Sequence, residues 1–326
     1  MRQQALVSLV AALTALPAYA QTDEWRLRMD EGAVADNAGD YLRAAAAYRD
    51  ATAIAERLDR TDRRRAVTWN SMGSVYAWLG RFVDAETAYR RALGAAEQAE
   101  GKSSPSYAWV LSNLGTLYVD TGQVARGEKL LRQSLAIQSA SDKADEVRIA
   151  IVQNALAQVL ATGGKYRDAE RLLLSSLTVL ENHASQRTEA ALARNNLGVV
   201  RYYQKSYVDA ERHLVQALAV LEQELGPDHP MLVRVLNNLA ALAGRTRRFE
   251  EAGQRLSRAI DIVERRLGPD HPMCGSLLSN YAACLRQSGD KSRAKTLQAR
   301  ANQILSDSSR RNGTGAVIDI SALQHK

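Results

Sequence analysis

A repeat of 41 or 42 residues runs through most of this 326-residue chain and limits the folds that it can adopt. Each copy has an apolar-periodic run, a polar turn, an aromatic residue or valine, and a second apolar-periodic run. One small residue in the second run marks every copy: Ala44, Ala85, Gly127, Ala169, Ala210, Ala252 and Ala294. The intervals are 41, 42, 42, 41, 42 and 42 residues. Seven copies in register predict an array in which each unit packs mainly on its neighbours.

Each copy is predicted to form two helices joined by a short turn. Apolar residues recur at helical spacing, and aromatic residues make up only 6% of the chain. After Pro17, every proline lies between copies, where it can end or begin a helix without breaking one. These prolines are Pro105, Pro227, Pro230, Pro269 and Pro272. We therefore expect an all-α solenoid of seven helix-turn-helix repeats.

The first 20 residues form a separate segment. Arg2 gives a positive start, Ala5 to Leu16 is apolar, and Ala18–Ala20 has the small-x-small pattern of a cleavage site. This pattern predicts a signal peptide that is cleaved between Ala20 and Gln21. We expect a periplasmic or secreted protein of bacterial type, with no membrane-spanning segment after cleavage.

The rest of the chain divides into a repeat array over residues 21–304 and a C-terminal tail over residues 305–326. The tail is rich in Ser, Arg and Gly and is expected to be flexible. Within it, Val317 to Leu323 alternates like a short strand, which is not stable alone. The alternatives are that this segment is disordered, lies back in the groove or lies on a partner's sheet edge.

The sequence Leu225–Pro230 (LGPDHP) recurs at Leu267–Pro272, and Leu236–Ala240 (LNNLA) lies between the two copies. These stretches resemble the long-period tetratricopeptide repeats of kinesin light chain, and the resemblance covers roughly residues 30–305. It implies a right-handed superhelix with a concave groove lined by the first helix of each pair. It specifies the repeat subtype but no biological role, because this scaffold serves many partners.

An asparagine recurs at one register of the first helices: Asn113, Asn154, Asn196, Asn238 and Asn280. In related superhelical repeats this position faces the groove and holds the backbone of an extended peptide. A carboxamide offers donors and an acceptor, so it can pair with a peptide unit. Successive asparagines about 10 Å apart would contact an extended peptide at roughly every third residue. The alternative is that these asparagines bond within the array, to a neighbouring helix or a backbone carbonyl.

Side chains beside the asparagine row are expected to select the ligand. The residues that the same register points into the groove are Trp109, Tyr202, Arg234, Arg245 and Arg286, with Tyr203 nearby. Their arginines make the C-terminal half of the groove basic, which suits an acidic or carboxylate-bearing peptide. The alternative is that these arginines are ordinary residues of a solvated surface.

No motif in the sequence predicts an enzyme, a cofactor or a metal site. Nucleophile-elbow, phosphate-loop and HExxH patterns are absent. His229 and His271 recur within identical turn motifs, so each is expected to cap local backbone. Cys274 and Cys284 lie ten residues apart on one predicted helix, which is beyond disulfide reach.

The predicted function is a non-enzymatic protein–protein interaction scaffold that binds an extended peptide segment of a partner in its concave groove. The alternative is a structural or assembly subunit that uses its convex face or its ends. A nucleic-acid binder is less favoured. The formal net charge is +7, but the chain has no run of five basic residues, and export argues against such a partner.

Overall fold

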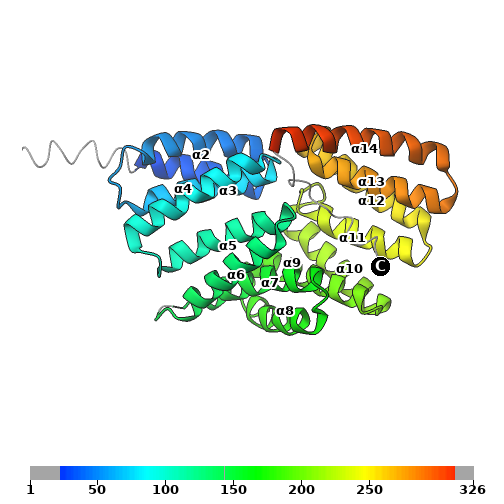
Figure 1. Ribbon diagram of the computed structural model, residues 1–326, viewed down its shortest axis with the longest axis horizontal. Coiled ribbons are helices and arrows are strands. Elements are labelled where there is room, and N and C mark those ends of the chain that lie inside the picture. The colour runs from blue at the N-terminus through cyan, green and yellow to red at the C-terminus, as the bar shows by residue number, and fades with distance from the viewer. Residues whose placement is uncertain (1–22, 143, 313–326) are drawn as a thin grey trace, which may run out of the picture.

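The computed structural model describes residues 23–142 and 144–312, and the regular elements in these ranges are all helical. The helices form seven antiparallel pairs that stack along a curved path (Figure 1). The predicted all-α solenoid of helix-turn-helix repeats is therefore confirmed. The predicted signal peptide lies outside the described residues.

The first pair joins a helix over 23–37 to α2 (Tyr41–Ala55). The next pairs are α3 (Arg63–Trp78) with α4 (Phe82–Glu100), α5 (Pro105–Asp120) with α6 (Val124–Ser139), and α7 (Glu146–Thr162) with α8 (Tyr166–Glu181). A short 3-10 helix, η1 (Ala184–Gln186), precedes α9 (Arg187–Tyr203), which pairs with α10 (Tyr207–Leu225). The last pairs are α11 (Leu232–Arg245) with α12 (Phe249–Arg266), and α13 (Pro272–Ser288) with α14 (Lys291–Asn312).

Small residues let the two helices of a pair approach closely. A Cβ on Gly127 of α6 would lie 2.6 Å from the carbonyl oxygen of Gly115 on α5. A backbone oxygen cannot move aside as a flexible side chain can, so glycine is required at this crossing. The same register holds alanine in the other repeats, and Ala85, Ala169 and Ala210 are fully buried.

The two LGPDHP turns begin helices as the sequence predicts. His271 precedes α13, and its Nδ1 accepts a hydrogen bond of 3.2 Å from the Met273 N–H. The Nδ1 atom of His229 accepts an equivalent bond of 3.2 Å from the Met231 N–H. Both histidines are buried, and the prediction that they cap local backbone is confirmed.

The same turns also close the array on itself, because the last repeats reach the first two (Figure 1). The Asn312 carboxamide, at the end of α14, accepts from the Phe82 N–H at 2.9 Å and donates to the Gly80 carbonyl at 3.0 Å. The Nε2 atom of His271 lies 3.0 Å from the Trp78 carbonyl oxygen. We call these contacts the terminal seam.

In the terminal seam, two glycines of N-terminal turns also lie against prolines of the LGPDHP turns. A Cβ on Gly80 would lie 2.9 Å from Cδ of Pro272, and one on Gly39 would lie 2.7 Å from Cδ of Pro230. Each LGPDHP turn thus packs on the turn of one N-terminal repeat, where a side chain would not fit. The motif therefore both begins a helix and joins the two ends of the solenoid.

The predicted start of the flexible tail at residue 305 is wrong. Helix α14 continues to Asn312, and Ser308 on its last turns is buried. The helix continues because its end packs into the terminal seam, a contact that local sequence does not reveal. The remaining tail residues, including the predicted strand at 317–323, lie outside the described residues.

Replacing Asn312 with alanine removes both seam hydrogen bonds of its carboxamide. We expect the free energy of unfolding to fall by about 1–2 kcal/mol. The Phe82 amide should also exchange its hydrogen faster. Urea unfolding and amide hydrogen exchange measure the two effects. Asn302→Ala, at an exposed site on the same helix, is the control, and equal effects of both changes would contradict a closed array.

Candidate binding groove

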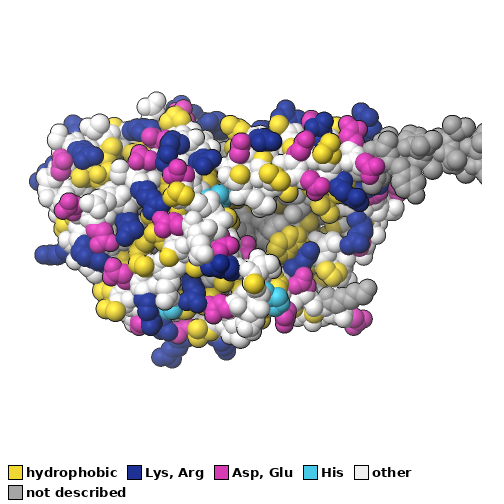
Figure 2. Space-filling view, turned by 180° about the vertical axis from the view of Figure 1, so that it is seen from behind, with side chains coloured by type: hydrophobic (Ala, Val, Ile, Leu, Met, Phe, Trp, Pro, Cys, Tyr) yellow, Lys and Arg dark blue, Asp and Glu magenta, His cyan; other side chains and the backbone are white. Residues whose placement is uncertain are grey.

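The first helices of neighbouring repeats form one continuous side of the solenoid. Helix α3 contacts α5, α5 contacts α7, and the series continues through α9, α11 and α13. The space-filling view shows the molecule hollowed on one face, with hydrophobic side chains at the edge of the hollow (Figure 2). The groove that these helices line is the candidate functional site.

The predicted asparagine row forms hydrogen bonds between neighbouring repeats. Four of its five members donate from Nδ2 to an asparagine Oδ1 of the preceding repeat at 2.8 Å: Asn113 to Asn70, Asn196 to Asn154, Asn238 to Asn195, and Asn280 to Asn237. These are bonds within the array, as in the alternative interpretation of the row. The backbone groups of each first helix bond within that helix, so these carboxamides supply the hydrogen bonds between first helices.

Asparagine doublets let this ladder continue from repeat to repeat. In α9, Asn195 accepts from the following repeat, whereas Asn196 donates to the preceding one. The two are also joined, because Asn195 Nδ2 donates to Asn196 Oδ1 at 3.1 Å. The first member of each doublet, Asn195 or Asn237, is at most 2% exposed. Sequence reasoning missed these members because it followed a single register.

Replacing Asn238 with alanine leaves the buried Asn195 Oδ1 without its donor. We expect the free energy of unfolding to fall by about 1–2 kcal/mol. Gln254→Ala, at an exposed site on the next helix, should change it by less than about 0.5 kcal/mol. Chemical unfolding of both variants checks this. If Asn238→Ala lowers the free energy of unfolding no more than Gln254→Ala does, the ladder adds no stability.

A cavity of about 1180 Å³ lies in the C-terminal half of the groove, lined by residues from α7 to α13 and by the turns that follow these first helices. Tyrosines form one wall. The rings of Tyr166 and Tyr203 are stacked with centroids 5.2 Å apart, and Tyr202 meets Tyr203 edge-on at 5.5 Å. Burial raises the pKa of Tyr203 to about 12, so its hydroxyl stays neutral. This wall offers flat apolar faces with polar tips.

The charged residues that line the cavity are all basic: Lys205, Arg245, Arg247 and Arg286. Arg245 donates to the Tyr207 hydroxyl at 3.1 Å, and Arg286 donates to Gln298 at 3.3 Å. No carboxylate lines the cavity, and none of the four cations forms an ion pair within the described ranges. The cavity therefore carries unneutralised positive charge.

Two arginines that are adjacent in sequence to lining residues of the cavity form ion pairs with carboxylates. Arg201 forms an ion pair with Glu170 at 2.6 Å, and Arg248 forms one with Glu211 at 2.7 Å. Both pairs join neighbouring repeats. These two arginines have carboxylate partners, whereas the three arginines of the cavity have none among the described residues.

Two of the cavity cations also stand in an unusual backbone conformation. Lys205 and Arg247 have φ values of 63° and 62°, in the left-handed region that favours glycine. The equivalent turn residue is glycine in the other five repeats: Gly39, Gly80, Gly122, Gly164 and Gly289. Holding a residue with a Cβ there costs on the order of 1 kcal/mol. The signal was visible in the sequence, as two non-glycine residues at a glycine register.

The side-chain amide of Asn237 is buried and does not make all of its possible hydrogen bonds. Asn237 lines the cavity and is 1% exposed, and its Nδ2 has no acceptor in the structure. A buried donor without an acceptor is destabilising. The Asn237 Nδ2 atom lies behind the cavity wall and is not accessible from the cavity in this conformation.

The other predicted groove residues lie elsewhere. Trp109 packs against Arg148, whose guanidinium carbon is 5.2 Å from the ring centroid. Arg234 of α11 donates to Gln158 of α7 at 3.1 Å, which links first helices two repeats apart. Burial raises the pKa of the nearby Asp120, and Arg234 opposes that shift. Arg234 thus holds the inner side of the solenoid together and is already engaged.

The cavity brings together four residues of the predicted site: Tyr202, Arg245, Arg286 and Asn280. It adds five that the sequence analysis did not select: Tyr166, Lys205, Tyr207, Asn237 and Arg247. No group of three His, Cys, Asp or Glu side chains in the described part of the chain could hold a metal ion. No described helix is long and apolar enough to cross a membrane.

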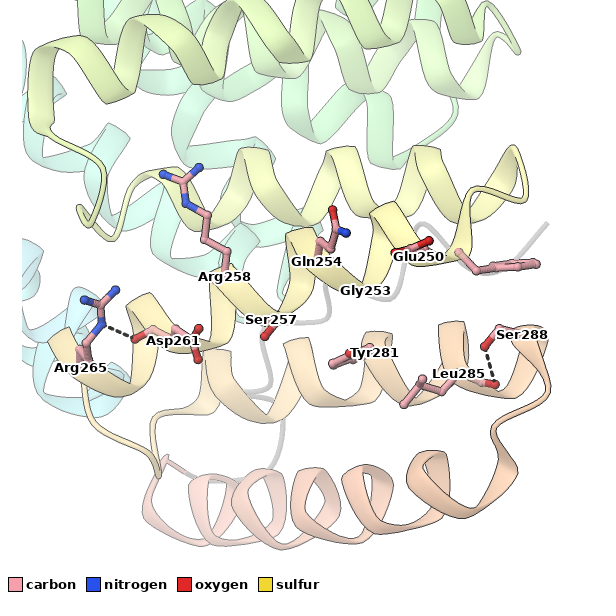
Figure 3. A pocket seen from close by; sticks show the side chains of 11 residues that line it. Glu250, Gly253, Gln254, Ser257, Arg258, Asp261, Arg265, Tyr281, Leu285 and Ser288 are labelled. Atoms are coloured by element: carbon pink, nitrogen blue, oxygen red, sulfur yellow. Dashed lines mark hydrogen bonds between the residues drawn. The ribbon is translucent and has the colours of Figure 1, made fainter.

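A second pocket of about 700 Å³ lies between α12 and α13 (Figure 3). Its lining mixes acidic and basic residues, and its arginines are engaged. Arg258 forms an ion pair with Glu222 at 2.6 Å, and Arg265 forms one with Asp228 at 2.9 Å. Figure 3 also shows the Nε atom of Arg265 donating to the backbone carbonyl of Asp261. Because both of its arginines already have carboxylate partners, this pocket is a weaker candidate than the basic cavity.

The family model for the tetratricopeptide repeat matches residues 64–138, 189–252 and 233–306, which is more than half of the chain. The chain belongs to the tetratricopeptide repeat family. Curated relatives include KINESIN LIGHT CHAIN-RELATED 2 of Arabidopsis thaliana, 26% identical over 188 residues, or 57% of this chain and 28% of that protein. Protein O-mannosyl-transferase TMTC1 of Homo sapiens is 34% identical over 102 residues, or 31% of this chain and 10% of that protein.

Solved structures share the fold of this tetratricopeptide repeat protein. BtubC (BKLC) from P. vanneervenii is 19% identical with a TM-score of 0.51, covering 70% of this chain and 91% of that one. A Rap protein complexed with Competence and Sporulation Factor is 14% identical with a TM-score of 0.57, covering 89% and 99%. The repeats are of the kinesin-light-chain-like type, and the fold is that of a protein–protein interaction scaffold. The chain spans 10–28% of the length of such curated relatives.

Proposed function

We propose that this protein is a non-enzymatic adaptor that holds an extended acidic segment of a partner protein in the basic cavity of its groove. The observation that carries the proposal is the group of four cations, Lys205, Arg245, Arg247 and Arg286, which have no carboxylate partner among the described residues. Acidic side chains of a partner would supply the missing charge.

The tyrosine wall and the asparagines suit the rest of such a segment. Tyr202 and Tyr203 offer ring faces to apolar side chains between the acidic ones. The Asn237 amide behind this wall is buried and lacks an acceptor, so its side chain would have to turn toward the cavity to bond a ligand. Most of the asparagine row bonds within the array, so main-chain contacts contribute less than the sequence alone implied. Charge and aromatic packing carry the recognition, and binding weakens as salt rises.

Charge reversal tests the proposal. The probe is a labelled synthetic peptide in which Glu alternates with Leu, beside the same peptide with Gln in place of Glu. We expect Arg245→Glu with Arg286→Glu to weaken binding of the Glu peptide by at least about tenfold at low salt, because two attractive contacts become repulsive. Fluorescence anisotropy measures the dissociation constants.

A matched control has the same change in net charge. Arg171 and Arg212 are exposed on second helices, and each pairs with an aspartate on its own helix. Arg171→Glu with Arg212→Glu should leave binding nearly unchanged. Equal loss in both double variants would mean that net charge alone attracts the peptide. No binding by the unaltered chain would favour the alternative, an assembly subunit that uses its convex face or its ends.

We also propose that the protein acts in the periplasm or outside the cell. The support is the signal-peptide pattern of residues 1–20. The mature chain should begin at Gln21, which mass spectrometry of the N-terminal peptide from envelope and medium fractions can establish. An intact Met1 in the cytoplasmic fraction would overturn this proposal.

A further inference from the structure

Among the described residues, the turn after the first helix has the same backbone hydrogen bond in the first six repeats. At this turn the residue after Lys205 donates its N–H to the Arg201 carbonyl at 2.9 Å. The residue after Arg247 donates to the Ala243 carbonyl at 2.8 Å. The first repeat has the same bond after Gly39, to the Ala35 carbonyl at 2.9 Å. The left-handed conformation is therefore imposed by the repeat, whichever residue occupies the position.

The fold gains no contact from the side chains of Lys205 and Arg247. Both are exposed, and neither has a hydrogen bond or ion pair with the described residues. Glycine suits this backbone better and is present in the five other repeats. A residue that strains the chain without a structural contact points to a role in binding.

Position accounts for glycine in the first two repeats and in the last, but not at Gly164, which lines the cavity and has open space around it. In the first two repeats the terminal seam leaves no room for a side chain at Gly39 or Gly80. The last repeat has open space around Gly289, but that residue does not line the cavity. Lys205 and Arg247 both line it, one repeat apart. The two departures from glycine thus fall at two of the three turns that line the basic cavity.

We infer that Lys205 and Arg247 select the ligand by each contacting an acidic side chain of the bound segment from these strained turns. The inference rests on the proposed function of the cavity. First helices one repeat apart are about 10 Å from each other, so the two cations match acidic residues roughly three apart in an extended chain. The strained backbone at both turns lowers the stability of the fold, and the contacts to the ligand would offset that loss.

Returning both turns to glycine separates binding from stability. We expect Lys205→Gly with Arg247→Gly to raise Tm by about 2–4 °C, because the strain is relieved. The same variant should bind the alternating Glu peptide about tenfold more weakly at low salt. A purely structural role predicts the rise in Tm with unchanged binding, and that result would overturn the inference.

Two glycine-to-lysine changes at the same register complete the test. Gly289→Lys adds a cation outside the cavity and should lower Tm without changing the dissociation constant. Gly164 lines the cavity and has open space around it, so Gly164→Lys should lower Tm and tighten binding several-fold. Equal binding by these two variants would also overturn the inference.

The outcomes distinguish this inference from the proposed function. If the unaltered chain binds the Glu peptide and Arg245→Glu with Arg286→Glu abolishes binding, but the double glycine variant binds normally, only the role of the turns fails. If the unaltered chain does not bind the Glu peptide, both fail. Preference for a labelled single-stranded oligonucleotide, lost in the double glycine variant, would assign the turns to nucleic acid and overturn the peptide inference.

Discussion

The terminal seam is the contact on which the shape of this solenoid depends. In a repeat array each unit contacts mainly its neighbours, so the curvature is a sum of small rotations and is compliant over its length. Here Asn312 and His271 tie the last repeats to the turns of the second, and Pro230 packs on Gly39 of the first. Joining the ends fixes the sum of those rotations, and with it the width of the groove.

Within that closed frame, polar groups on the inner side have two distinct roles. The asparagine ladder and Arg234 join first helices to one another, so their hydrogen-bonding capacity is largely used inside the protein. The cavity cations have no carboxylate partner among the described residues. A groove organised in this way has a rigid wall and a charged region that is free to bind, and rigid walls lower the cost of ordering on association.

Strain and charge coincide in the same repeats. Most turns after the first helices use glycine, whereas two of the three turns that border the cavity use Lys205 and Arg247. Natural proteins tend to break local rules at functional positions. The agreement of two independent observations, one from backbone geometry and one from ion pairing, strengthens the case for this part of the groove over the pocket between α12 and α13.

The sequence by itself determined the helices, the turns and the seven-fold repeat, because these depend on spacing, proline placement and the small residue at each crossing. It also pointed to Tyr202, Arg245 and Arg286. Only the tertiary structure decided that the asparagines bond one another, that α14 continues to Asn312 and that the array closes. Those features join residues from different repeats, and their contacts depend on the accumulated curvature of the stack, which no local pattern encodes.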